Sequence, residues 1–399
     1  MDISKKIKLW AATFSIMAFI LYILLILSDY ALQRFISSSN EREVTKAEQI
    51  ERTRIANEDI PQRMEAIKSG YKPLFYPETI DNYAPLRDLS ISLRATPLAP
   101  QPSSNLYFCN EGYGLIKYKT DRFGFRNKDA LWDQKIDVVL FGDSFTHGAC
   151  VDDSKTISGQ LLAKVNTLNL GTYGNHAIHY ASLEKVFIPV IKPKFAVTIF
   201  YANDNDADKD SHFYDAYFSR NEPYFDQSNG TLILSKNIQN FYSQADVLID
   251  KLLSGEQSPD EYIKNYSKTG WTSKFLKYLK LPTLRRQIEN YLRGSGYITK
   301  LPTSNILAID TLESECKKNG CIPVIAYIPN SNFWRADPRS IYYAASLAAY
   351  CKVRGIKFVD TTQLIIESGD NTFATKGPHL SPHGYQLVAG ELLKAIGSN

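Results

Sequence analysis

The stretch VVLFGDSFTHG, residues 138–148, joins a run of β-branched and aromatic residues to the polar triplet Gly142, Asp143 and Ser144. The apolar run predicts a buried strand, and the triplet lies where that strand would end. Two interpretations are open here. Ser144 is a nucleophile at the carboxyl edge of a parallel sheet, or Asp143 and Ser144 only cap the helix that follows.

Similar short apolar runs recur along the chain, each stopping at Gly, Asn, Asp or Pro. They are IDVVLFGDS (136–144), TLNLG (167–171), FAVTIFYAND (195–204), CIPVIAYIP (321–329) and IKFVD (356–360). Stretches of helical character lie between them. Apolar strands that alternate with helices predict a parallel sheet covered on both faces. Ligands of such sheets gather outside the carboxyl ends of the strands, where Ser144 and the YAND stretch would lie.

The first apolar segment of the chain, Leu9–Ser28, contains no charged residue and is long enough to cross roughly 30 Å of hydrocarbon as a helix. Lys5, Lys6 and Lys8 precede it. The positive-inside rule therefore predicts a single-pass membrane protein with a cytoplasmic N-terminus and an extracytoplasmic body, periplasmic in a Gram-negative cell. A cleaved signal peptide is the alternative. The length of the apolar run and the lack of a small-x-small site favour an uncleaved anchor.

These features divide the chain into three predicted parts. Residues 1–30 form a cytoplasmic tip and a transmembrane anchor, and residues 31–105 form a juxtamembrane helix and an irregular, proline-containing linker. Residues 106–399 form the α/β domain, with an insertion at about 207–303 that serves as a lid or a substrate wall. Within it, residues 222–235 predict a hairpin with Asn229 and Gly230 as its turn.

Composition excludes some classes of partner. The chain of 399 residues is 44% hydrophobic and 22% charged, as in globular proteins, and its formal charge is only +4. No basic block interleaved with aromatic residues appears, so we expect no nucleic-acid partner. Five cysteines in an extracytoplasmic body predict disulfide bonds, with an odd one left over. We hypothesise a bond between Cys109 and Cys150; the alternative is that all five are reduced.

Four residues along the chain match the needs of acyl transfer, which are a nucleophile, a base and donors to the developing oxyanion. Ser144 offers a hydroxyl and a backbone N–H at the start of a helix. Gly174 offers a backbone N–H that a ligand can approach closely, and Asn203 offers a side-chain amide. His379, in KGPHLSPHGY, is the candidate base.

These four residues, in this order and at these strand ends, resemble the SGNH hydrolases, also called the GDSL family. The resemblance covers roughly residues 120–395 and begins with TDRFGFRN (120–127), which is similar to a segment that often precedes the nucleophile strand in envelope members. It implies a flavodoxin-like three-layer α/β/α sandwich and acyl chemistry without a metal or cofactor. By this likeness Ser144 is the nucleophile, His379 the base, and Ser144, Gly174 and Asn203 form the oxyanion hole.

The sequence departs from the family pattern at two places. Tyr201 stands where the family usually has Gly, two residues before the Asn. The family usually has an Asp two or three residues before the His, and this chain has Gly377 and Lys376 at those positions, with Pro378 directly before the His. The group that orients the imidazole is therefore missing from its expected place. Asp370, Asp360 or a backbone carbonyl are the candidates for that role.

Two histidine and aspartate patterns invite a metal. His176 and His179 have a spacing that zinc sites use, but no strong third ligand stands nearby. The run from Asp204 to Asp210 lacks the Gly and Glu that complete an EF-hand loop. We expect no metal site at either place, and His147 is expected to line the pocket beside Ser144.

Three hypotheses of function follow. The first is a membrane-anchored serine esterase, deacetylase or O-acyltransferase that acts on acylated glycans or other cell-envelope esters. The second is a catalytically weak or inactive module of the same fold that binds carbohydrate or acts as a scaffold. The third, a nucleotide- or flavin-binding protein, has the least support because no Gly-rich phosphate loop follows the first strand.

Overall fold

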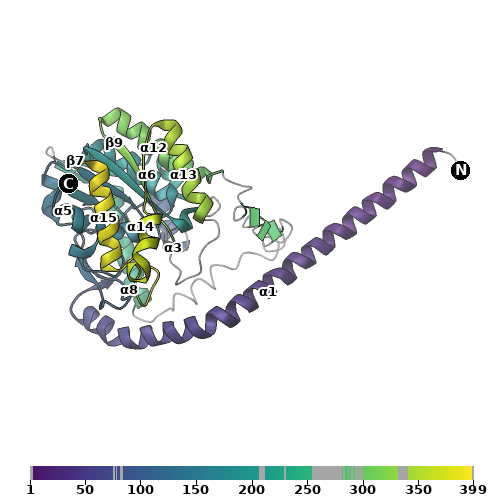
Figure 1. Cartoon of the computed structure of the whole chain (residues 1–399), viewed down its shortest axis with the longest axis horizontal. Helices are drawn as coiled ribbons and strands as arrows, with labels where there is room; N and C mark the ends of the chain where they lie inside the picture. Colours follow the sequence, from purple (N-terminus) through teal and green to yellow (C-terminus); the bar gives the residue numbers. More distant parts are fainter. Residues whose placement is uncertain are drawn as a thin grey trace. The chain divides into compact units, whose positions relative to one another are not determined.

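A five-stranded sheet in which all strands run parallel forms the centre of the computed structural model (Figure 1). Its strands, in the order β10-β9-β6-β4-β5, are β4 (Val138–Gly142), β5 (Thr167–Asn169), β6 (Phe195–Tyr201), β9 (Ile322–Ile328) and β10 (Lys357–Asp360). Numbered along the chain, this order is 2-1-3-4-5, that of flavodoxin. All five strands fall on the apolar runs of the sequence, and the predicted α/β fold is confirmed.

Helices cover both faces of this sheet. They are α5 (Ile157–Leu162), α6 (Ala177–Ile191), α12 (Thr303–Asn319), α13 (Ser340–Arg354), α14 (Thr362–Ser368) and α15 (Pro382–Ile396). Helix α6 packs against α12, and α5 packs against α15. Because parallel crossovers are right-handed, the reversal of direction after β5 puts these two pairs on opposite faces. Every residue of β4 and β6 is buried, as expected for strands covered on both sides.

The structure describes residues 3–74, 77, 79–80, 84–205, 212–228, 231–253, 281, 284–285, 287–288, 291–292, 295, 300–330 and 340–397. Contacts divide the chain into two units, one of Met1–Asn57 with Lys264–Ile298 and one of Glu58–Ile263 with Thr299–Asn399. The parallel sheet belongs to the second unit.

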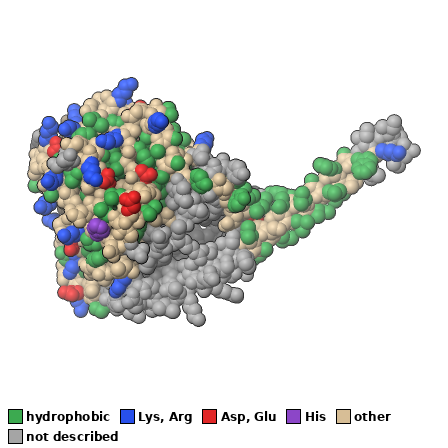
Figure 2. All heavy atoms as spheres, in the orientation of Figure 1, with side chains coloured by type: hydrophobic (Ala, Val, Ile, Leu, Met, Phe, Trp, Pro, Cys, Tyr) green, Lys and Arg blue, Asp and Glu red, His purple; other side chains and the backbone are tan. Residues whose placement is uncertain are grey.

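Helix α1 (Ile3–Lys68) runs past the predicted boundary at residue 30. Its segment Trp10–Leu32 is long and apolar enough, with a mean hydropathy of 2.4, to cross a membrane. The large hydrophobic side chains of this segment, among them Trp10, Phe14 and Leu24, are exposed (Figure 2). Exposed apolar side chains over this length are what a lipid-facing helix requires.

The segment predicted as an irregular linker packs on the main core. Helix α3 (Ala84–Leu93) and the residues after it bury Leu86, Ala95 and Leu98 in the same cluster as Val139 of β4. A second, three-stranded sheet follows, in the order β1 (Lys72–Pro73), β2 (Asn105–Tyr107), β3 (Lys117–Lys119). The linker prediction relied on prolines and overlooked these apolar residues, whose burial favours packing over a free spacer.

The insertion contains the predicted hairpin. Strands β7 (Phe225–Ser228) and β8 (Thr231–Leu234) pair antiparallel, while the predicted turn residues, Asn229 and Gly230, lie outside the described residues. Helix α8 (Lys236–Leu253) follows the hairpin. Shorter elements of this unit are η1 (Asp129–Asp133), α4 (Ser144–His147), η2 (Asp153–Lys155), η3 (Ala202–Asn205), α7 (His212–Tyr214), η4 (Asp215–Ser219) and η6 (Gly369–Thr372).

Candidate active site

Ser144 is the first residue of α4, directly after the carboxyl end of β4. Asp143 caps this helix, because its carboxylate accepts a hydrogen bond of 2.9 Å from the backbone N–H of Phe145. Burial raises the pKa of Asp143 to about 6, against the lowering effects of that bond and of the nearby His379. Asp143 therefore caps the helix, as the second interpretation predicted. The hydroxyl of Ser144 takes no part in this cap and has a different partner.

His379 lies in a loop immediately before α15, which begins with Ser381 as its N-cap. The backbone of this loop is closed by hydrogen bonds from Ala374 N–H to the His379 carbonyl and from Ser381 N–H to the Thr372 carbonyl. Nε2 of His379 lies 2.9 Å from Oγ of Ser144. Folding thus brings together two side chains that are 235 positions apart in the sequence, and both are buried.

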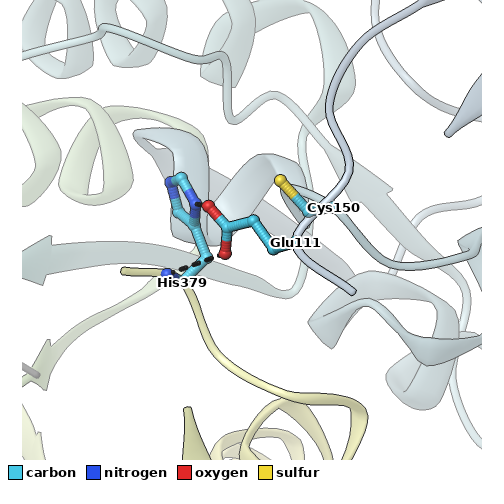
Figure 3. A group of neighbouring side chains, drawn as sticks. All are labelled: Glu111, Cys150 and His379. Carbon is cyan, nitrogen blue, oxygen red and sulfur yellow. Dashed lines mark hydrogen bonds and ion pairs between the residues drawn. The ribbon is translucent and has the colours of Figure 1, made fainter. Parts of the chain in front are cut away.

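The other ring nitrogen of His379 faces a carboxylate from far upstream. Oε1 of Glu111 lies 2.6 Å from Nδ1, and Oε2 of the same group accepts the backbone N–H of His379 at 3.1 Å (Figure 3). A carboxylate can only accept, so Nδ1 carries the proton and Nε2 is left to accept the hydroxyl proton of Ser144. Ser144, His379 and Glu111 form one chain of hydrogen bonds.

Glu111 is therefore the carboxylate beside the imidazole, and Asp360 is not. Asp360 ends β10 at the edge of the sheet, and its exposed side chain accepts from Thr362. Strands β9 and β6 lie between β10 and β4, so Asp360 at the end of β10 is about 14 Å from β4, the strand that leads to Ser144. Asp370 belongs to η6, and its side chain lies outside the described ones.

The three predicted oxyanion donors follow three neighbouring strands. Ser144 follows β4, Gly174 follows β5 and Asn203 lies in η3 directly after β6. Gly174 has a φ of +77°, a conformation that favours glycine. Asn203 is exposed, while the next residue, Asp204, accepts the N–H of Tyr201 at 2.9 Å and so holds the turn. All three residues thus lie at the same edge of the sheet, where the carboxyl ends of β4, β5 and β6 meet.

Tyr201, the departure from the family pattern in this block, packs beside the nucleophile turn. Its ring stacks on that of Phe145, with 3.9 Å between the ring centroids. The ring of Phe145 in turn lies 5.0 Å from that of His379. An aromatic ring at position 201 therefore supports the helix that carries Ser144.

The TDRFGFRN segment (120–127) packs against the end of β5, beside the candidate site. The buried carboxylate of Asp121 accepts from the backbone N–H groups of Phe123 and Phe125 and from the side chain of Asn127. Asn127 also exchanges two hydrogen bonds of 2.9 Å with the backbone of Asn169 at the end of β5. The segment therefore fixes the ends of the strands that carry the candidate site.

The remaining histidines near Ser144 have structural contacts. His147 is buried, and its Nε2 lies 2.9 Å from the hydroxyl of Tyr118. Burial, and then the charge of Arg126, lower the pKa of His147 well below its ordinary value. Nδ1 of His179 accepts the backbone N–H of His176 at 3.0 Å and so closes the first turn of α6.

Two disulfides are present. One joins Cys109 to Cys150 and the other joins Cys316 to Cys321, while Cys351 is free and buried. The ligand atoms of Glu111, Cys150 and His379 lie within 4.8 Å of one another (Figure 3). This group does not suit a metal as it stands, because a thiolate is the sulfur ligand and the sulfur of Cys150 is in a disulfide.

Glu111 is the residue of this constellation that sequence reasoning missed. It lies 268 positions before His379, in a short loop with no motif of its own. The signal that could have found it is the hypothesised bond of Cys109, two residues away, to Cys150, which follows Ser144 by six positions.

Several solved structures are similar to about two thirds of this chain. No family model and no curated protein matches it. A solved structure of a lipolytic G-D-S-L family protein from Veillonella parvula is 14% identical, with 66% of this chain and 99% of that chain covered and a TM-score of 0.36. A lipase/acylhydrolase from Enterococcus faecalis is 14% identical (65% and 95% covered, TM-score 0.36). An acetylxylan esterase from Geobacillus stearothermophilus is 12% identical (66% and 95% covered, TM-score 0.34).

Proposed function

We propose that this chain is a membrane-anchored serine esterase or O-acyltransferase that acts on acylated glycans or other cell-envelope esters. The hydrogen-bonded chain from Ser144 Oγ through the His379 ring to Glu111 carries the proposal. The main argument for an inactive scaffold was that no carboxylate stood near the histidine in the sequence. Glu111 supplies a carboxylate beside His379, so that argument no longer holds.

The proposed reaction begins with the hydroxyl of Ser144. Its oxygen attacks the ester carbonyl carbon, Nε2 of His379 takes the hydroxyl proton, and the carbonyl electron pair moves onto oxygen. The backbone N–H of Ser144, the N–H of Gly174 and the amide of Asn203 are the proposed donors to that oxyanion. The bond to the alcohol then breaks, and the alcohol leaves with the proton from His379. Water or a sugar hydroxyl then attacks the acyl-enzyme in the same way, with His379 taking its proton and returning it to Ser144. Attack by water gives hydrolysis, and attack by a sugar hydroxyl gives acyl transfer.

Glu111 acts through His379 as a positioning residue. Its carboxylate holds the proton on Nδ1, keeps Nε2 aimed at Ser144 and stabilises the imidazolium that forms when the hydroxyl proton is taken. The ion pair forms in a buried site, where such an interaction is stronger than in water.

Labelling with a fluorophosphonate probe tests the proposal. We expect the full chain in detergent to be labelled at Ser144 and to cleave acetyl or butyryl esters. The Ser144→Ala variant should show neither. Absence of labelling at Ser144, with ester cleavage no greater than in Ser144→Ala, would exclude the esterase. Saturable glycan binding without turnover would instead favour the scaffold.

A further inference from the structure

The loop that carries Glu111 is a tight hairpin tip between β2 and β3. Backbone hydrogen bonds from Phe108 N–H to the Ile116 carbonyl and from Ile116 N–H to the Cys109 carbonyl close its base. Inside the loop, the side-chain oxygen of Asn110 accepts from the N–H groups of Gly112 and Gly114. Cys109 is therefore the last residue at the base, and Glu111 lies two residues further along the tip.

The sulfur of Cys109 is bonded to Cys150, which belongs to the segment just after α4. That segment is held firmly on both sides of Cys150. The buried guanidinium of Arg126 donates to the Gly148 and Val151 carbonyls, each at 2.8 Å, and the hydroxyl of Tyr385 donates to the Ala149 carbonyl at 3.1 Å. Cys150 is thus a fixed point of the same turn that carries Ser144.

The small sheet behind the hairpin has short strands, and its noncovalent contacts to helix α4 run through Phe108 and Tyr118, which lie against His147. Strands β2 and β3 have three residues each, and β1 has two. Short strands of this kind are marginal without further packing. The side chain of Glu111 lies against Gly377, where a Cβ would come within 1.9 Å of its carboxyl carbon. The disulfide is the covalent link that connects this hairpin to the turn after the nucleophile.

We infer that the Cys109–Cys150 disulfide is a positioning element of the reaction, because it holds Glu111 against His379. The inference rests on the proposed function. Reduction by a dithiol breaks the S–S bond with two electrons and two protons, forms two protein thiols and oxidises the dithiol to its own disulfide. The hairpin then samples other conformations, Glu111 leaves Nδ1, and the rate of acyl-enzyme formation falls while substrate binding is unchanged.

A mutational cycle on the full chain tests this inference. We expect Cys109→Ser with Cys150→Ser to lower kcat on an acetyl ester by about 10²-fold, the size of effect that a displaced catalytic group produces, with little change in KM. Adding Glu111→Gln to this double variant should lower kcat much less than Glu111→Gln does in the native chain, because both changes remove the same interaction. All assays contain EDTA, so that a metal bound by reduced Cys150 with Glu111 and His379 does not contribute.

The second disulfide provides the matched control. Cys316 and Cys321 lie just before β9, at the amino edge of the sheet and so opposite the candidate site. Cys316→Ser with Cys321→Ser should therefore keep native kcat. In that background Cys109–Cys150 is the remaining disulfide, so a dithiol should lower kcat and reoxidation should restore it. This reversible assay also covers the case in which the serine variant does not fold.

Two outcomes would overturn the inference. One is native kcat in the reduced control background, with thiol counting to show that the bond is open. The other is a full additional loss when Glu111→Gln is added to the cysteine variant. Both leave the proposed function standing as long as Ser144→Ala is inactive. Equal activity of Ser144→Ala and the native chain would instead reject the proposed function itself.

Discussion

At the scale of single residues, the deciding contact is the one between Glu111 and His379. The carboxylate accepts from both the ring and the backbone N–H of the histidine, which fixes the ring orientation as well as the position of its proton. An aspartate two or three residues before the histidine would do the same from the same loop. Here the carboxylate comes from a different element, and the positions two and three residues before His379 are Gly377 and Lys376.

We expect Glu111→Gln to lower kcat by about 10²- to 10⁴-fold, because a glutamine cannot stabilise an imidazolium as a carboxylate does. Asp360→Asn is the control, since that side chain bonds to Thr362 and should leave kcat unchanged. Steady-state kinetics on an acetyl ester measures both. A large loss in Asp360→Asn with little loss in Glu111→Gln would reverse the assignment.

A second residue-scale prediction concerns His147 and acid stability. Burial lowers the pKa of His147 below its ordinary 6.5, so the unfolded chain binds a proton at this site before the folded chain does. The free energy of unfolding therefore falls as the pH drops below about 6.5. His147→Gln removes this effect, and the loss of stability between about pH 7 and pH 5 should shrink by about 1–2 kcal/mol.

Urea denaturation of the full chain in detergent, followed by tryptophan fluorescence, measures this difference. His383→Gln is the control, because that histidine is exposed on α15 and its replacement should leave the pH dependence as in the native chain. The same pH dependence in His147→Gln and the native chain would contradict the prediction.

At the scale of elements, the site depends on loops that meet above the sheet. Strand β4 and α4 carry Ser144, the β2–β3 loop carries Glu111, and the loop before α15 carries His379. The last two loops touch where Gly377 lies against the Glu111 carboxyl group. The absence of a side chain at position 377 is thus what lets a carboxylate from another element approach the histidine.

Gly377→Ala should displace Glu111 and lower kcat by about 10²-fold, because its Cβ would lie 1.9 Å from the carboxyl carbon of Glu111. Gly390→Ala is the matched control. A Cβ at position 390, in α15, meets no atom within 4 Å, and alanine favours a helix over glycine by about 1 kcal/mol. We expect native kcat and no loss of thermal stability for Gly390→Ala. Native kcat in Gly377→Ala would show that this contact does not control Glu111.

At the scale of the whole molecule, the chain combines an α/β unit built on a parallel sheet with an apolar helical segment. Trp10–Leu32 is long and apolar enough to cross a membrane, and Lys5, Lys6 and Lys8 precede it. The positive-inside rule would then place the sheet and its candidate site outside the cytoplasm. Two disulfides in the α/β unit agree with such an oxidising location.

A reporter enzyme that is active only after export tests this orientation in cells. Fused after Asn399, it should be active, and the fusion should stay in the membrane after carbonate extraction. Fused after Lys8, before the apolar segment, it should be inactive. An inactive fusion at Asn399 would reverse the orientation. Release of the intact α/β unit into the soluble fraction would indicate a cleaved signal peptide instead.

Local sequence patterns were enough to predict the strands of the parallel sheet, the apolar helical segment and the candidate roles of Ser144 and His379. These features are local, because a strand or a spanning helix is written in the burial pattern of a few consecutive residues. Ser144 and His379 were recognisable because they lie in motifs at strand and helix ends. The hypothesised bond between Cys109 and Cys150 rested on their places along the chain, before the first strand of the parallel sheet and just after the Ser144 turn.

The carboxylate that faces His379 is set by the packing of distant elements and could not be predicted from local patterns. Glu111 has no periodicity or motif around it, and the sequence instead favoured Asp370 and Asp360 because they are near His379 along the chain. The contact spans 268 positions and exists because the β2–β3 hairpin, the turn after α4 and the loop before α15 pack together. Such a contact depends on the packing of distant elements, whereas the residues around each partner encode only their own local structure.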